Sequence, residues 1–373
     1  MTFQQQRGDN YATPLPPQPP HRTHLRTLAA IGLALLGTAA YSQTSGEKSS
    51  YTLYGRVDVG LRNTPTDLSK NDDRQWSVGN SSAGRFGFIG KEDLGGGLAA
   101  VFRLESRFDA DTGVVQTDKN ATGQLFKQYA YVGLQSHKLG SITLGKQSSP
   151  ADEANASRFE AFDGDSLAAN GSRTARVFQK WNNAIYYATP RWSGVKLGVG
   201  AAPGEGVHTR AYGLVALYDQ GPLSLSSSYQ RESYVEGSPD KAGDDARTTV
   251  TLAGSYDFTR FKLLGLYARS SKLNLADTGA ERVLTLGTIV PLGQHRLLAS
   301  LRWIDGDQIK TTGDHSSDKD SVRLGLGYQY DFSKRTLVAV SLAQERMKTF
   351  AKSGAEASAR NGTGYEVALR HKF

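Results

Sequence analysis

Charged and apolar side chains alternate in the segment AVFRLESRF, and this spacing limits the chemistry that they can do. Arg103, Glu105 and Arg107 are separated by single residues, so on a β-strand all three share one face. Phe102 and Leu104 take the opposite face. A row of fixed charges on one face of a strand suggests electrostatic screening of ions and polar solutes.

The sequence offers no comparable set of residues for catalysis or metal binding. The pair Glu92–Asp93 precedes the turn LGGG, where we expect it to stabilise the turn. The seven histidines are scattered, without HExxH or a pair at metal-ligand spacing, and there is no cysteine. The glycine-rich stretches LGGGLA and RLGLGYQY do not open helices, so they are no phosphate loops. We therefore expect no enzyme activity, no cofactor and no metal.

The alternating pattern recurs along the chain from about residue 50 to the end. Roughly sixteen segments of about ten residues alternate in this way, separated by Gly, Asn, Asp, Ser or Pro. They are 51–62, 85–94, 98–108, 126–135, 140–147, 182–190, 195–202, 210–220, 223–234, 247–258, 261–273, 282–292, 295–305, 321–332, 335–347 and 364–373. Amphipathic helical stretches of similar length do not interrupt them, which argues against a βαβ architecture.

The first and last segments indicate how the sheet closes. In YTLYGRVDVGLR, Arg56 and Asp58 lie on the polar face, where we expect them to form a pair. The chain ends on Phe373 directly after an alternating segment, although free termini usually fray. We expect the last strand to pair with the first, which removes both edges of the sheet.

The connections favour a transmembrane barrel over a soluble sandwich. Short turns alternate with long polar loops, and aromatic residues cluster beside the short turns, as in outer-membrane barrels. Each strand has one thin apolar face, which is too little for the two inner faces of a sandwich. An arginine turned to lipid at mid-membrane costs about 2–4 kcal/mol, so we expect the charged face to line a water-filled lumen. About sixteen strands leave an aqueous channel.

The N-terminal part has the three regions of a secretory signal. Arg22 and Arg26 precede the apolar stretch LAAIGLALL (28–36). A cleavage site follows, at Thr38–Ala39–Ala40 or at Ala40–Tyr41–Ser42. The apolar stretch is shorter than the roughly 20 residues of a spanning helix. We predict that residues 1–42 are a removed extension plus signal peptide, and that residues 43–373 form one barrel domain.

The charge balance is basic, with a formal net charge of +8. The basic residues are spread singly along the strands, without a run of five or more, so we do not expect nucleic acid as a partner.

Several segments together resemble the trimeric general porins of Gram-negative outer membranes, of the beta-proteobacterial type. The matching stretches are YTLYGRVDVGL, SSAGRFGFIGKEDLGGGLAAVFRLESRF, AYVGLQSHKLGSITLGKQ, NNAIYYATP and the terminal LRHKF. The resemblance implies an all-β, antiparallel up-and-down barrel of sixteen strands in a homotrimer, with the third loop folded into the lumen. It also implies that Phe373 is part of the signal read by the barrel assembly machinery.

The resemblance also implies a constriction between a basic wall and carboxylates of the third loop. Arg85 matches a wall arginine, and Arg103 and Arg107 join it on the inward face. Gln128 and Lys180 stand near positions where the family often has arginine, which predicts a weaker wall and leaves the sign of selectivity open. The third-loop acids are Asp152, Glu153, Glu160, Asp163 and Asp165.

The sequence favours an outer-membrane porin for passive diffusion of ions and small hydrophilic solutes, in contact with outer-membrane lipid and lipopolysaccharide. A barrel with a solute-specific site is the alternative. A barrel enzyme or an adhesin with a plugged lumen would need a marked nucleophile or longer loops.

Overall fold

The computed structural model describes residues 49–64, 75–118, 123–155, 157–170, 180–203, 210–233, 246–271, 279–307, 319–350 and 356–373, within the compact unit Gln43–Phe373. The leader predicted at residues 1–42 lies outside the described residues. Within these ranges, no helix is both long and apolar enough to cross a membrane.

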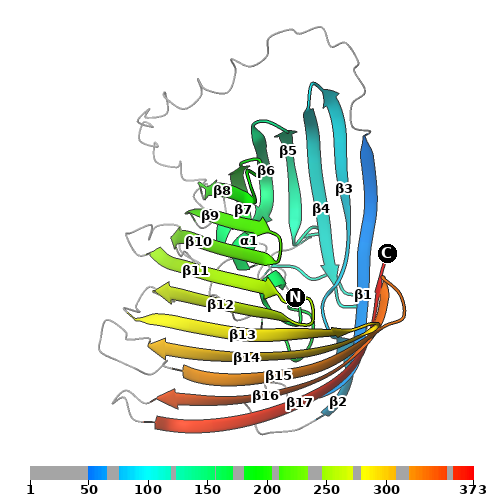
Figure 1. Ribbon diagram of the computed structural model, residues 1–373, viewed down its shortest axis with the longest axis vertical. Coiled ribbons are helices and arrows are strands. Elements are labelled where there is room, and N and C mark those ends of the chain that lie inside the picture. The colour runs from blue at the N-terminus through cyan, green and yellow to red at the C-terminus, as the bar shows by residue number, and fades with distance from the viewer. Residues whose placement is uncertain are drawn as a thin grey trace, which may run out of the picture. The chain divides into compact units, whose positions relative to one another are not determined.

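The described residues form strands almost throughout (Figure 1). The strands are β1 (Ser50–Thr64), β2 (Gln75–Asn80), β3 (Gly84–Gly95), β4 (Leu98–Phe108), β5 (Tyr129–Ser136), β6 (Gly140–Ser148), β7 (Lys180–Ala188), β8 (Val195–Ala202), β9 (Ala211–Gln220), β10 (Leu223–Ser233), β11 (Ala246–Asp257), β12 (Lys262–Ser271), β13 (Ala280–Leu292), β14 (His295–Asp307), β15 (Lys319–Asp331), β16 (Thr336–Phe350) and β17 (Glu356–Lys372). A short helix, α1 (Pro150–Asn155), and a 3-10 turn, η1 (Ser157–Phe159), follow β6.

These seventeen segments build a closed antiparallel barrel of sixteen strands, because two of the segments share one strand position. β3 pairs with the first half of β1, and β2 pairs with the second half. They are therefore two halves of one barrel strand that is interrupted at Ser81–Ala83. β1 also pairs with β17, with Asp58 opposite Arg370. The predicted fold is therefore confirmed, and the last strand does pair with the first.

Side chains alternate between the two faces of the barrel wall as the sequence pattern predicts. On β1, Leu53 and Leu61 are exposed on the outside, whereas Arg56 and Asp58 are buried on the inside. Exposed apolar and buried charged side chains would be unfavourable in a soluble protein. They suit a barrel whose outside faces lipid and whose inside faces water.

Most strand limits lie within three residues of the sequence prediction, and the start of β17 differs most. β5 begins at Tyr129 instead of residue 126, and β17 begins at Glu356, eight residues before the expected start at 364. The early part of β17 is polar and alternates poorly, but β16 continues beside it to Phe350, so the backbone ladder extends without an apolar face.

The short turns have the chemistry expected of them. In the β3–β4 turn, Gly95, Gly96 and Gly97 have positive φ, which glycine adopts without steric cost. Asp93 accepts the N–H of Gly95 at 3.0 Å, so this acid stabilises the turn as predicted. Aromatic rings pack beside other short turns, for example Phe258 against Phe261 with ring centroids 4.8 Å apart.

Candidate functional site

The third loop begins after β6 with a short helix that its own sequence specifies. Pro150 occupies the first helical position of α1, where a missing N–H costs nothing. Ser149 precedes it, and its hydroxyl accepts the N–H of Asp152 at 3.1 Å, as a helix N-cap does. The loop is thereby turned away from the rim immediately after the strand.

The inner barrel wall binds this helix through polar contacts. The N–H of Ala151 donates to the side-chain oxygen of Gln230 at 3.0 Å, and Ser226 donates to the carbonyl of Ala154 at 2.7 Å. Gln230 and Ser226 both lie on β10 and both are buried. The helix therefore lies against inward-facing side chains of β10.

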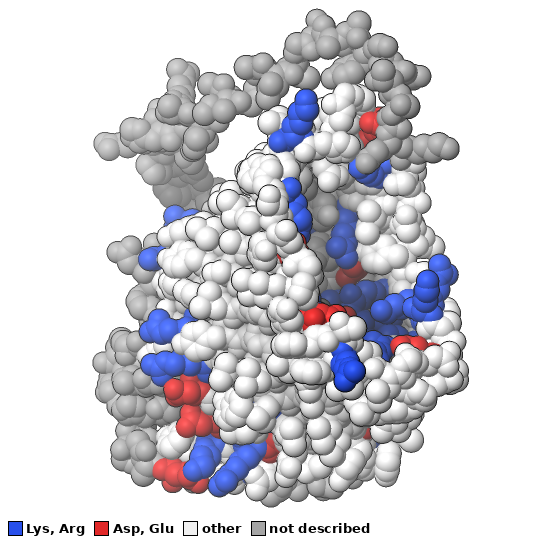
Figure 2. Space-filling model, in the orientation of Figure 1, with Lys and Arg blue, Asp and Glu red and all other residues white. Residues whose placement is uncertain are grey.

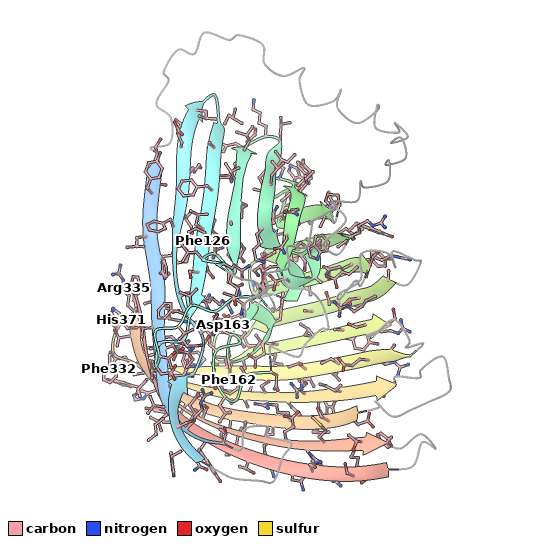
Figure 3. All side chains as sticks on the ribbon, turned by 180° about the vertical axis from the view of Figure 1, so that it is seen from behind. Phe126, Phe162, Asp163, Phe332, Arg335 and His371 are labelled. Carbon is pink, nitrogen blue, oxygen red and sulfur yellow. The ribbon has the colours of Figure 1, made fainter. Side chains whose placement is uncertain are left out.

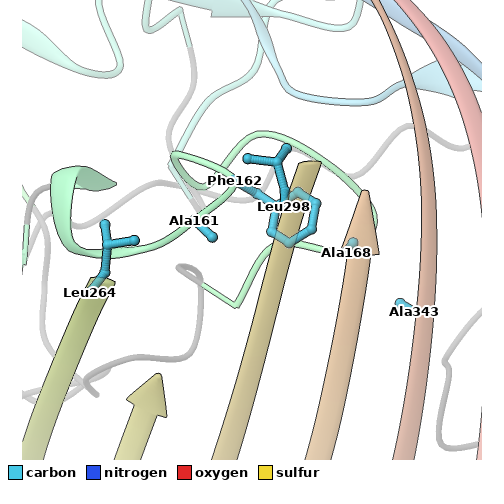
Figure 4. Packing of buried hydrophobic residues seen from close by; sticks show 6 residues of the cluster. All are labelled: Ala161, Phe162, Ala168, Leu264, Leu298 and Ala343. Carbon is cyan, nitrogen blue, oxygen red and sulfur yellow. The ribbon is translucent and has the colours of Figure 1, made fainter. Parts of the chain in front are cut away.

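The middle of the loop is held by apolar packing on the same wall. Phe159 is buried with inward residues that include Leu266 and Val283. Farther along, Ala161, Phe162 and Ala168 pack with Leu264, Leu298 and Ala343, which belong to β12, β14 and β16 (Figure 4). This accounts for apolar residues on the lumen side of these strands, where water would otherwise be the neighbour.

Glycine on β15 permits the closest approach of the loop. A Cβ added at Gly325 would lie under 3.0 Å from the backbone oxygen of Ala168. We expect Gly325→Ala to displace the loop and to change single-channel conductance measurably. Gly265→Ala is the matched control, because its added Cβ would lie 3.5 Å from the nearest heavy atom. Equal conductance in both variants would show that the loop does not rest on Gly325.

The tip of the third loop is fixed by a buried carboxylate among arginines. Asp165 pairs with Arg56, which donates to both carboxylate oxygens, and accepts the hydroxyl of Ser82 at 2.6 Å. Arg370 donates to the backbone oxygen of Asp165 at 3.0 Å, and Arg85 lies 3.8 Å from its carboxylate. Ser82 lies in the interruption between β2 and β3, so this interruption provides part of the binding site for the Asp165 carboxylate.

The predicted pair between Arg56 and Asp58 is wrong. Asp58 instead accepts from Nε of Arg370 at 2.7 Å, on the neighbouring strand β17, while Arg56 turns to Asp165. Residues two apart on a strand share a face, but a residue directly across the ladder is closer than the next one on the same strand.

A second contact holds the backbone beside the tip. The carboxylate of Glu366 accepts the N–H of Leu167 at 3.1 Å and the hydroxyl of Ser81 at 2.7 Å. Arg323 donates to the carbonyl of Leu167 from the opposite side. The tip is therefore clamped to β15, to β17 and to the interruption after β2.

The charge environment predicts how the tip responds to acid. Burial acts to raise the pKa of Asp165, but the arginines Arg56 and Arg370 outweigh it and lower that pKa below its usual 3.8. A lowered carboxylate pKa means that the anchor is complete above about pH 4 and is lost only as the pH falls below 3.8. We expect wild-type channel noise to stay constant from pH 7 to about pH 4 and to rise below it. An Asp165→Asn variant should lack this acid step.

Three of the residues predicted to form the basic wall, Arg85, Arg103 and Arg107, lie on β3 and β4. Arg85 pairs across the ladder with Arg107, and Arg103 follows on the same face. Arg103 donates to Glu105 at 2.7 Å, and its guanidinium lies 3.8 Å from the ring centroid of Tyr129. Within the described residues, Nε of Arg107 has no hydrogen-bond partner.

The other predicted wall residues are engaged in contacts of their own. Gln128 is buried, and its N–H donates to the carbonyl of Glu105 at 3.1 Å. Lys180 pairs with Asp152 of α1 and lies 4.8 Å from the ring centroid of Tyr129. Lys180 and Asp152 thus fasten the base of the loop to β7.

The remaining third-loop acids differ in exposure. Glu153 pairs with Lys196 of β8 at 3.2 Å. Glu160 is buried and accepts the N–H groups of Phe162 and Gly164, both at 3.0 Å, so it shapes the loop instead of facing open space. Asp163 is exposed and has a φ of 56°. Figure 3 labels its position in the loop. Of the five predicted acids, Asp163 extends freely from the loop.

Residues that the sequence reasoning missed complete the site. Tyr54 donates to Glu105 at 2.7 Å and accepts from Arg103 at 2.9 Å. Arg370 and Arg323 bind the loop tip, as described above. The contact of Arg370 with a loop two hundred residues earlier has no local signal in the sequence. Among the described residues, no group of His, Asp and Glu is arranged to hold a metal ion.

The barrel is closed, its exterior is apolar, its interior is charged, and a loop folds against its inner wall. These features are those of a channel-forming membrane barrel. A family model described as Gram-negative porin matches residues 27–349. An outer membrane porin protein of Bordetella pertussis is 29% identical, covering 93% of this chain and 99% of the relative. Outer membrane porin protein 32 of Delftia acidovorans is 30% identical, covering 91% of this chain and 99% of the relative.

Solved structures agree with this assignment. The anion-selective porin from Comamonas acidovorans superposes with a TM-score of 0.71 at 26% identity, covering 87% of this chain and all of that one. The chain therefore belongs to the Gram-negative porin family. It is an outer-membrane channel for passive diffusion, and its relatives are channels rather than enzymes.

Proposed function

We propose that this porin passes ions and small hydrophilic solutes through a waist between the basic wall and the third loop, with a weak preference for anions. The basic wall means Arg85, Arg103 and Arg107, and the acid that opposes it is Asp163. The solved relative from Comamonas acidovorans is described as anion-selective, which agrees with this sign.

The observation that carries the proposal is a difference in exposure between acids and bases. Asp58, Glu105 and Asp165 have exposed fractions of 0%, 1% and 6%. The side chains of Arg85 and Arg103 are 28% and 27% exposed. These three carboxylates are thus covered, whereas Arg85 and Arg103 present part of their positive charge to a passing ion.

Opposing charges keep the preference weak. Asp163 is exposed on the loop, and the pairs Lys180–Asp152 and Lys196–Glu153 are neutral overall. The Debye length is about 8 Å at physiological salt, so charges across a waist of similar width act on an ion between them. The field runs across the pore, so it favours polar solutes over apolar ones.

Removing wall arginines should reduce the chloride preference. A unit charge about 8 Å from an ion contributes about 0.5 kcal/mol in water, a factor of about 2.4 for each ion. Removing a positive charge makes the electrostatic energy of chloride in the waist less favourable and that of potassium more favourable. Arg85→Gln or Arg107→Gln should therefore lower the chloride-to-potassium permeability ratio by about two- to fivefold. Reversal potentials under a KCl gradient measure this ratio.

The control for these variants is Arg260→Gln. Arg260 is exposed at the β11–β12 turn, away from the wall strands β3 and β4. An unchanged ratio in Arg85→Gln and Arg107→Gln, or an equal fall in Arg260→Gln, would contradict the proposed waist.

We also propose that the channel is a homotrimer that contacts outer-membrane lipid and lipopolysaccharide and is inserted by the barrel assembly machinery. Membership of the porin family supports this, and one solved neighbour is described as a trimer form, although it shares only 14% identity. The mass of the protein–detergent complex, measured by light scattering, tests the trimer directly.

A further inference from the structure

A second basic site lies at the short-turn end of the barrel, apart from the waist. A cavity of about 590 Å³ opens between the β13–β14 turn, the β15–β16 turn and the end of β17. Its charged lining residues are Arg296, Asp331, Lys334, Arg335 and Lys372. Figure 3 shows Arg335 and His371 where these strand ends meet. Figure 2 shows a hollowed face with blue basic side chains and fewer red acidic ones around it.

Strand register places this cavity on the inner side of the wall. Leu337, which lines the cavity, pairs with Arg370, and the guanidinium of Arg370 binds Asp58 inside the barrel. Lys372 follows Arg370 by two residues on the same face, a rise of roughly 7 Å. The cavity therefore lies on the path that a solute takes past the waist.

The cavity carries an excess of uncompensated positive charge. Asp331, its acid, already accepts from Arg296 at 2.7 Å. Within the described part of the chain, no ion pair involves Lys334, Arg335 or Lys372, and all three are exposed. The nearby C-terminal residue Phe373 uses its backbone oxygen to accept the N–H of Gly55 at 3.0 Å. Nε of Arg296 is buried without a partner among the described residues.

The backbone around these cations is held in place. The hydroxyl of Ser333 accepts the N–H groups of Arg335 and Thr336, both at 3.1 Å. The N–H of Lys372 donates to the carbonyl of Arg335 at 2.8 Å, which ties the turn to β17. A site on a fixed backbone spends less free energy on ordering when it binds a ligand.

We propose that this cavity is a binding site for small organic anions that carry phosphate or several carboxylate groups. Its volume falls in the range of about 300–1,000 Å³ that small-molecule sites occupy. Guanidinium and ammonium groups from three strand ends match the separated negative charges of such a solute. Together with the waist, the site gives the channel a second group of cationic side chains along its inner wall.

The test measures block of chloride current by inorganic phosphate, added to one side of a bilayer at a time. Binding should give a saturable block in the wild type, stronger from the side of the short turns. Lys334→Gln/Arg335→Gln should weaken the apparent affinity by about tenfold, because two charge-assisted contacts are lost. The control Lys138→Gln/Arg260→Gln removes two exposed cations from other short turns and should bind phosphate as the wild type does.

The outcomes separate this site from the waist and from lipid. Equal phosphate affinity in both double variants, with normal chloride conductance, would overturn the second site and leave the proposed function intact. Loss of chloride conductance in the wild type would contradict the proposed function itself. Titration of the detergent-solubilised protein with phosphate, and separately with vesicles containing phosphatidylglycerol, distinguishes a soluble anion from a lipid headgroup. Binding to the vesicles alone would also overturn the site as a solute station.

Discussion

Replacing Asp165 by asparagine is expected to loosen the third loop and to make the channel noisy and more anion-selective. The carboxylate lies between Arg56 and Arg370, and its side chain is 7% exposed. Removing one partner of a buried ion pair costs about 3–5 kcal/mol, because the remaining charges stay buried without compensation. Single-channel recordings should show frequent substates, and the reversal potential should move towards chloride.

Asp163→Asn separates the two effects. It removes the same charge from the same loop, but Asp163 is exposed and takes no part in the anchor. We expect the control to raise the chloride preference by about two- to fivefold without added noise. Quiet Asp165→Asn channels would show that the tip is held by its backbone and apolar contacts alone.

Deleting Phe373 is expected to have the largest effect on assembly. Phe373 and Gly55 exchange both backbone hydrogen bonds, at 3.0 and 3.1 Å, and these bonds lie at the seam between β17 and β1. A Cβ added at Gly55 would lie within 3.0 Å of the Phe373 ring, so the ring covers this glycine closely. Without the two backbone hydrogen bonds of Phe373, the end of the pairing between β17 and β1 exposes unpaired backbone groups, which cost several kcal/mol each in lipid.

Folding in two settings shows which role of Phe373 dominates. Refolding of the purified deletion variant into lipid vesicles tests closure of the seam, and expression in cells also tests recognition by the assembly machinery. We expect the folded yield to fall in both, and to fall further in cells. Phe332→Ala, which removes an exposed aromatic ring beside the β15–β16 turn, is the control and should fold normally. Normal yields of the deletion variant in both settings would contradict both roles.

The strands could be predicted from the sequence because the alternation of apolar and polar residues is a local signal. Each strand carries its own period of two, and the breaks between strands contain turn residues. β2 was missed because its six residues lie inside what reads as a polar loop. The start of β17 was missed because pairing with β16, not an apolar face, defines it.

The sequence predicted which types of residue form the site and on which face of each strand they lie. It did not predict which residues they contact. Arg56 and Asp58 were placed correctly inside the barrel, yet Arg56 binds a residue 109 positions away and Asp58 one 312 positions away. The acids of the third loop have similar sequence surroundings, but the fold buries Glu160 and Asp165 and exposes Asp163. Such differences arise from how the loop packs on the wall, which alternation along single strands does not encode.

Single-channel conductance of the purified wild-type protein, with its reversal potential under a KCl gradient, tests the central claim most directly. Open channels with a modest reversal potential towards chloride are expected, because Asp58, Glu105 and Asp165 are buried whereas Arg85 and Arg103 are partly exposed. A reversal potential towards potassium would show that Asp163 and the other loop acids dominate the waist. Correctly folded protein without conductance would contradict the channel itself.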